Sequence, residues 1–210
     1  MLSKHFFFIL LTSIIVVSTL SSQAATFRLP NLAGNTGDEV CMPIRARDFS
    51  DVTEFGFTIT WDTDALGFSR VRNLNPAFNN FAEVSVFPGA NIPGVNTFTT
   101  AAGSLTAYWR LWEDGQTCES ITNSLTFEDT DSVNPTLEDP ILFEVCYNVL
   151  SSNYGEITDV EFFNTPQPRI ITKKLSNNQC TTNDVLGTID GSITVGVSPL
   201  ILNVEIPQGN

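Results

Sequence analysis

The chain has a single histidine, His5, and it lies in the first 24 residues, which carry the marks of a removable leader. The rest of the chain therefore cannot form a Ser-His-Asp or Cys-His nucleophilic site or a histidine-ligated catalytic zinc. Among common hydrolytic designs, chiefly a pair of carboxylates remains. The acids considered for such a pair are Glu54, Asp62, Glu113 and Asp114. Nothing in their spacing singles them out, so we expect no enzymatic activity.

Basic residues are scarce as well, with 10 Lys and Arg against 23 Asp and Glu and a net charge of −13. Removal of a leader containing Lys4 would make this charge −14. Such a surface repels nucleic acid and anionic membranes, so neither is expected as a partner.

Long apolar runs are missing except at the start, where Phe6 to Val17 is interrupted only by Thr12 and Ser13. This run is short for a bilayer span, and Ser22-Gln23-Ala24 supplies the small residues that a signal peptidase reads. We therefore expect residues 1–24 to be a signal peptide cleaved after Ala24. The mature chain would be secreted, either extracellular or on the cell surface, without membrane insertion.

No CxxC pair occurs among the four cysteines, Cys41, Cys118, Cys146 and Cys180. An even number of cysteines in an exported chain predicts two disulfides, and three pairings are open at this point. A metal site is the alternative, but the wide spacings disfavour it. We therefore expect neither a metal centre nor a cofactor.

A helical stripe is also lacking, and short segments rich in Phe, Val, Ile and Thr alternate with Gly, Pro, Asn and Asp. This pattern predicts an all-β sandwich or barrel. Strands are expected at 26–32, 38–46, 53–62, 66–74, 103–112, 139–150, 155–165 and 185–197. Residues 82–88 are a further candidate in the less clear region 77–103, and two polar loops are expected at 113–138 and 165–184.

The clearest strand is "TEFGFTITW", residues 53–61. Its apolar positions are Phe55, Phe57, Ile59 and Trp61, and between them lie Glu54, Gly56, Thr58 and Thr60. Alternation with a period of two predicts one face in the core and one face in water. The polar face raises the question of what it contacts.

In sequence order, these segments resemble a cohesin domain. Gly37-Asp38 precedes a strand containing Val40, Met42, Pro43 and Ile44, and the alternating aromatic strand ends at Trp61-Asp62. A tight turn then leads to Leu66 and Phe68. Further on, "LTAYWRLW", "ILFEVCYNV" and "GSITV" match the sixth, seventh and last strands of that family.

The resemblance implies a two-sheet jelly-roll β-sandwich of about nine strands, with sheet orders 8-3-6-5 and 9-1-2-7-4. Residues 25–197 would form this domain and residues 198–210 a C-terminal tail. In this topology Cys41 and Cys146 lie on neighbouring strands and point away from the core, which implies a disulfide between them. Cys118 and Cys180 follow strands that run parallel, so their loops share one end and a second disulfide is feasible.

Cohesins bind dockerin, a small calcium-loaded helical module, through the 8-3-6-5 sheet. The matching partner-binding positions here would be Glu54, Gly56, Thr58, Thr60 and Asp62. On the sixth strand Trp109 and Leu111 form the better core pair, which leaves Tyr108, Arg110 and Trp112 for the exposed face. The resemblance thus implies a secreted, non-catalytic module that recognises a dockerin-like or other surface protein, in a polysaccharide-degrading or adhesive assembly.

Two other functions remain open. A carbohydrate-binding module could use Tyr108 and Trp112, whereas Trp61 is in phase with the core. A structural subunit could instead self-assemble by strand addition at a sheet edge. The acids of 113–138 could also bind calcium, although no EF-hand spacing occurs and a solvated loop is the simpler interpretation.

Overall fold

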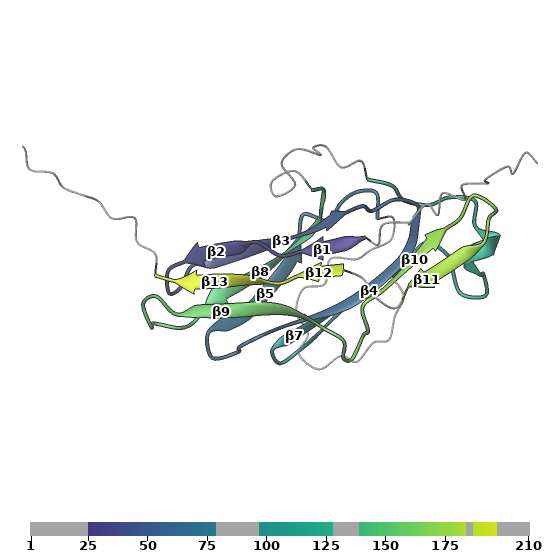
Figure 1. Cartoon of the computed structure of the whole chain (residues 1–210). Coiled ribbons are helices and arrows are strands. Elements are labelled where there is room, and N and C mark those ends of the chain that lie inside the picture. Colours follow the sequence, from purple (N-terminus) through teal and green to yellow (C-terminus); the bar gives the residue numbers. More distant parts are fainter. Residues whose placement is uncertain (1–24, 79–96, 128–138, 184–186, 197–210) are drawn as a thin grey trace, which may run out of the picture.

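The structure is a computed structural model that describes residues 25–78, 97–127, 139–183 and 187–196. The expected signal peptide, the strand at 82–88 and the C-terminal tail lie outside these residues. The described residues form two packed β-sheets, as the sequence predicted, with one 3-10 turn at Cys118–Ser120 (Figure 1). No helix formed by them is long and apolar enough to cross a membrane.

Sheet A has the strand order β12-β1-β3-β8-β5. Its strands are β1 (Thr26–Arg28), β3 (Glu39–Arg47), β5 (Leu66–Arg72), β8 (Ile141–Val149) and β12 (Gly187–Ile189). This is the order 9-1-2-7-4 expected from the resemblance. The pairs β3–β8 and β5–β8 are antiparallel and contain one register shift each, whereas β1 and β12 run parallel.

Sheet B has the order β11-β10-β4-β9-β13-β2, and β7 pairs with both β4 and β6. Its strands are β2 (Asn31–Gly34), β4 (Val52–Trp61), β6 (Thr97–Ala101), β7 (Ser104–Arg110), β9 (Ile157–Phe163), β10 (Ile170–Lys174), β11 (Cys180–Asn183) and β13 (Gly191–Val195). Both β9 and β10 pair with the same edge of β4, at different parts of its length, so together they take the place of the eighth strand in the expected order 8-3-6-5. The expected order 8-3-6-5 is thus confirmed, with β6 in the fifth position.

The first and last expected strands are each divided in two, and both change sheets. Pro30 follows β1 and lacks the N–H group that would continue the ladder. Opposite this break, a Cβ at Gly191 would come within 2.4 Å of the Pro30 carbonyl oxygen, so only glycine permits the approach. The chain therefore pairs β1 with β12 in sheet A and β2 with β13 in sheet B, and these strands join the two layers (Figure 1).

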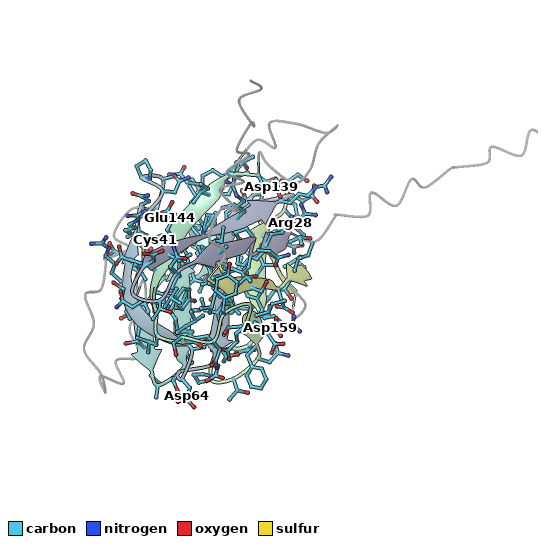
Figure 2. All side chains as sticks on the ribbon, turned by 90° about the vertical axis from the view of Figure 1, so that its left-hand side faces the viewer. Arg28, Cys41, Asp64, Asp139, Glu144 and Asp159 are labelled. Atoms are coloured by element: carbon cyan, nitrogen blue, oxygen red, sulfur yellow. A yellow bond between two sulfur atoms is a disulfide. The ribbon has the colours of Figure 1, made fainter. Side chains whose placement is uncertain are left out.

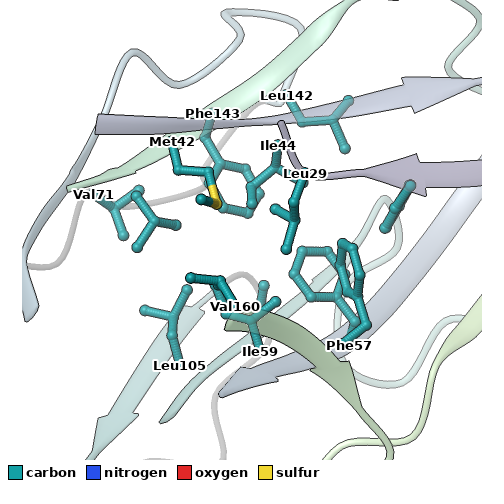
Figure 3. Packing of buried hydrophobic residues seen from close by; sticks show 14 of the residues in the cluster. Leu29, Met42, Ile44, Phe57, Ile59, Val71, Leu105, Leu142, Phe143 and Val160 are labelled. Atoms are coloured by element: carbon teal, nitrogen blue, oxygen red, sulfur yellow. The ribbon is translucent and has the colours of Figure 1, made fainter. Parts of the chain in front are cut away.

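Aromatic side chains dominate the core between the sheets. Phe57 is fully buried, and its ring contacts Phe27 edge-on at 5.1 Å and Phe162 at 5.3 Å. It also stacks on Phe143 of the opposite sheet at 6.1 Å between ring centroids. Ile59 and Leu105 from sheet B face Met42 and Ile44 from sheet A in the same layer (Figure 3). The alternation of β4 thus produces the predicted core face.

The segment 165–184 is not the polar loop that its composition predicts. It contains the hairpin of β10 and β11, and Ile171 is fully buried. Lys173 is only 6 % exposed, because its Nζ donates to the carbonyl oxygen of Asp48 at 3.1 Å. Two consecutive lysines suggest a solvated loop, but the aliphatic stem of a lysine can be buried when its ammonium finds an acceptor.

Both predicted disulfides are present. Cys41 and Cys146 lie directly opposite each other on β3 and β8, with 3.9 Å between their Cα atoms. Cys118 in the 3-10 turn is joined to Cys180, the first residue of β11, with a Cα–Cα distance of 6.1 Å. The second bridge fixes the hairpin of β10 and β11 to the loop that follows β7.

Phe57→Ala should destabilise the fold by about 3–5 kcal/mol, because it leaves a cavity among rings from both sheets. Phe163→Ala is the matched control, since that side chain is 52 % exposed and should change the stability little. Guanidinium unfolding with both disulfides intact measures the two free energies. Equal losses for the two variants would contradict the core assignment.

Candidate functional site

The outer face of β4 is not the solvated surface that its polar residues predict. Thr58 is fully buried, Glu54 is 9 % exposed and Gly56 is buried. Only Thr60, which is half-buried, and Asp62, which is exposed just beyond the strand, are accessible. The expectation that all five positions face water is therefore wrong for Glu54, Gly56 and Thr58.

A six-residue segment between β9 and β10, residues 164–169, covers this face, and we call it the strap. The Thr58 hydroxyl donates to the carbonyl oxygen of Gln167 at 3.2 Å and accepts its N–H at 3.1 Å. A Cβ at position 56 would lie 2.7 Å from Nε2 of the Gln167 side chain and 3.0 Å from the Tyr108 ring. Gly56 thus makes room for Gln167 and Tyr108 against β4.

Glu54 is held by hydroxyl groups from strands on both sides. The Tyr108 hydroxyl on β7 donates to one carboxylate oxygen, and the Thr172 hydroxyl on β10 donates to the other. Burial, together with the hydrogen bond to Glu54 and the negative charge of Glu54, raises the pKa of Tyr108 to about 12. Both oxygens of Glu54 are therefore engaged inside the protein, which does not suit a catalytic carboxylate pair.

The other predicted binding residues on β7 and after it also have partners within the chain. Arg110 forms an ion pair with Asp114, and its guanidinium carbon lies 5.9 Å from the centre of the Trp112 ring. Trp112 is half-buried, and Trp109 is fully buried in the core as predicted. A flat aromatic surface for sugar stacking is thus partly occupied by a cation.

A strongly exposed surface of sheet B lies on β9, to whose residues the sequence motifs assign no role. Side chains of β9 alternate strictly, so that Thr158, Val160 and Phe162 are buried. The side chains of Ile157, Asp159, Glu161 and Phe163 are exposed on the other face. This alternation is visible in "ITDVEFF". Its exposed half could have been identified from the sequence, but not its position beside a covered β4.

The acidic groups of the described residues give no support for a metal centre. The one group with suitable spacing, Glu39 with Cys41 and Cys146, contains two cysteines that are joined in a disulfide. Arg70 binds the Glu39 carboxylate as well. Of the predicted acidic loop 113–138, residues 128–138 lie outside the described residues.

Comparison with known proteins identifies the fold. No family model matches the sequence, and no curated protein does. Solved structures of cohesin domains do match. The cohesin CaCohA2 from Clostridium acetobutylicum is 18 % identical with a TM-score of 0.52, and the match covers 84 % of this chain and 94 % of that one.

Two further matches agree. The seventh type I cohesin of ScaB from Pseudobacteroides cellulosolvens is 15 % identical, with a TM-score of 0.53 and coverage of 84 % and 96 % of the two chains. The OlpC cohesin in a cohesin–dockerin complex from Clostridium thermocellum is 10 % identical, with a TM-score of 0.54 and coverage of 82 % and 93 %. The chain therefore has a cohesin-like fold, as its sequence motifs indicated.

Thr58→Val should loosen the strap, because it keeps the side-chain shape but removes both hydrogen bonds to Gln167. An unsatisfied N–H that is fully buried costs about 1–3 kcal/mol, and Gln167 is only half-buried, so its backbone amide should exchange with solvent faster by a factor of up to about 5 to 150. Thr60→Val, two residues along the same face, is the control. Unchanged protection of Gln167 in Thr58→Val would show that the strap is held by other contacts.

Glu54→Gln should lower the pKa of Tyr108 from about 12 towards its ordinary value of 10, since the carboxylate charge is lost while burial remains. A tyrosine that keeps its proton more tightly in the folded state stabilises that state below pH 10. This contribution is lost as the pH rises through 12. An NMR titration of the Tyr108 ring measures the pKa in both proteins. An identical value would mean that Glu54 does not bind the phenol.

Proposed function

We propose that this protein is a secreted, non-catalytic binding module that recognises a dockerin-like protein partner through the outer face of sheet B. The fold supports this proposal most directly, since cohesin structures that match it, such as that of OlpC, were solved as complexes with dockerins. A fold does not by itself fix a function, so the residues of the face must decide the partner.

The compartment and the domain limits belong to the same proposal. Two disulfides fit an oxidising compartment, as does the signal-peptide pattern of residues 1–24. The binding domain would then span residues 25–197, with residues 198–210 as a tail. On the surface of a cell or outside it, such a module would link proteins into an assembly, for instance one that degrades polysaccharides.

The accessible part of the predicted site supports a protein ligand over a sugar. Thr60 and Asp62 remain open at one end of β4, and exposed residues of β9 extend this surface. Trp112, the residue on which the carbohydrate alternative depends, has the Arg110 guanidinium over its ring. A mixed polar and apolar sheet face is typical of protein–protein contact surfaces.

The direct test is calorimetry of the disulfide-bonded protein with a set of calcium-loaded dockerins. We expect a 1:1 complex with at least one of them that is lost when EDTA unfolds the dockerin. Thr60→Arg should weaken this complex about tenfold or more, because it places a long cation on the accessible part of the face. Asn148→Arg is the control, since Asn148 is exposed on the outer side of sheet A.

Three results would overturn the proposal. Binding to insoluble polysaccharide that is lost in Trp112→Ala, without any dockerin complex, would favour the carbohydrate-binding module. Concentration-dependent assembly of the pure protein would favour the structural subunit. Equal effects of Thr60→Arg and Asn148→Arg on a dockerin complex would place the partner away from sheet B.

A further inference from the structure

The strands of sheet A collect the basic residues of an otherwise acidic chain. The chain contains 10 Lys and Arg, and half of them are arginines on these strands: Arg28 on β1, Arg45 and Arg47 on β3, and Arg70 and Arg72 on β5. The same strands carry only two acids, Glu39 and Glu144. Sheet A is therefore positively charged, although the chain as a whole has a net charge of −13.

The arginines of sheet A divide into a neutralised pair and a group of three. Arg70 pairs with Glu39 at 2.5 Å, and Arg72 pairs with Glu144 at 2.7 Å, both at the β5 edge of the sheet. The other three lie on β1 and the adjoining part of β3, and we call them the arginine cluster: Arg28, Arg45 and Arg47.

The strand register places the members of the arginine cluster side by side. Arg28 lies directly opposite Arg45 on the neighbouring strand, and Arg47 follows two residues later on the same face of β3. Asp139 adjoins them, because its carboxylate accepts from Arg28 at 3.3 Å and its backbone carbonyl oxygen accepts from Arg45 at 2.6 Å. Figure 2 shows Arg28 and Asp139 next to each other on sheet A, away from Asp159 of sheet B.

The arginine cluster keeps positive charge that the described residues do not neutralise. The Arg47 side chain is half-buried and forms no ion pair or hydrogen bond with any of them. The bond of Arg45 to a backbone carbonyl oxygen leaves its charge in place. Like charges directly opposite each other destabilise a sheet, so the cluster is not explained by the folding of this chain.

Apolar groups border the arginine cluster on the same face of the sheet. Ile189 on β12 is the register partner of Arg28, and its side chain is 45 % exposed. Pro43 is half-buried and precedes Arg45 by two residues on β3. Arginines beside accessible apolar groups are typical of surfaces that contact another protein.

The spacing within β3 fits an extended acidic segment of a partner protein. A guanidinium group binds a carboxylate through two parallel hydrogen bonds. Arg45 and Arg47 are two residues apart on one strand, a distance of about 6.5–7 Å, and same-face side chains of any extended peptide have this spacing. Two acids at alternate positions of such a peptide would therefore meet both arginines.

Other anionic partners fit the arginine cluster less well. A long acidic polysaccharide would extend from the cluster over the rest of a strongly acidic chain, which repels it. It would also offer no apolar side chain to Pro43 and Ile189. A second copy of this chain would bring two molecules of high negative charge together.

We infer that the arginine cluster is a second binding surface of this protein and docks a short, extended acidic segment of another protein. Two carboxylates of the segment would bind Arg45 and Arg47, and an apolar side chain next to them would cover the border formed by Pro43 and Ile189. The outer faces of the two packed sheets point in opposite directions, so this surface is separate from the one proposed to bind a dockerin. A protein with both surfaces would join two partners.

The test uses the full mature protein with both disulfides and a synthetic peptide of the pattern leucine-threonine-glutamate-threonine-glutamate. In NMR spectra, the side-chain Nε–H signals of Arg45 and Arg47 should shift, and amide changes should centre on β1 and residues 43–47. A peptide with lysine in place of both glutamates is the negative probe and should cause no shift. Raising the ionic strength from about 0.01 M to about 0.15 M should weaken the binding, because salt screens the charges.

Two variants of equal charge test the assignment to the arginine cluster. Arg47→Gln should weaken peptide binding about threefold to tenfold, because one charged pair with the peptide is lost. Arg70→Gln removes the same charge from the same sheet, but Arg70 is already paired with Glu39, so the affinity should change less than about twofold. Unfolding curves that match the unmodified protein establish that both variants fold.

A change in the peptide tests the apolar border. Replacing its leucine by serine should weaken binding about threefold through lost apolar contact, with the shifts of Arg45 and Arg47 retained at saturation.

Several results would overturn the inference. Shift changes centred on sheet B, or equal losses for Arg47→Gln and Arg70→Gln, would place the acidic segment elsewhere. Binding of an oligogalacturonate that depends on Arg47, without binding of the peptide, would assign the cluster to an acidic glycan instead. Self-association of the pure protein that is lost in Arg47→Gln would assign it to a contact between copies.

Discussion

The hydrogen bonds between the Thr58 hydroxyl and the backbone of Gln167 hold the strap across β4, and they determine how much of the outer face of β4 is exposed. β4 is buried on both faces from Val52 to Ile59, and the strap covers its outer face at Gly56 and Thr58. Its polar residues then serve packing: Gly56 accommodates Gln167, and Glu54 joins hydroxyls from two flanking strands. On the outer face of β4, only the end at Thr60 stays accessible.

The change of sheets by the first and last strands places the open surface. Close approach of Gly191 to Pro30 lets β13 leave sheet A and pair with β9, so that β9 has a neighbour beyond the end of β4. The Cys118–Cys180 bridge anchors the hairpin of β10 and β11 at the far end of the same sheet. Local backbone constraints at a few positions therefore determine which strand presents exposed side chains.

The likeness to cohesins concerns the fold of this chain, whereas the exposed side chains of sheet B are its own. Matches at 10–18 % identity establish the fold, because the order of strands is conserved where side chains are not. The side chains of the exposed surface are particular to this chain: Asp159 and Glu161 lie between Ile157 and Phe163 on the outer face of β9.

The sequence by itself determined the all-β class and the core face of β4 and, through the family resemblance, the order of the strands and both disulfides. These properties follow from alternation and spacing along short segments, or from motifs that lie close together in the chain. It could not determine whether the polar face of β4 meets water. That depends on Gln167 and Thr172, which lie 109 and 118 residues from their partners Thr58 and Glu54. Alternation shows which residues share a face, but only the tertiary structure decides what covers it.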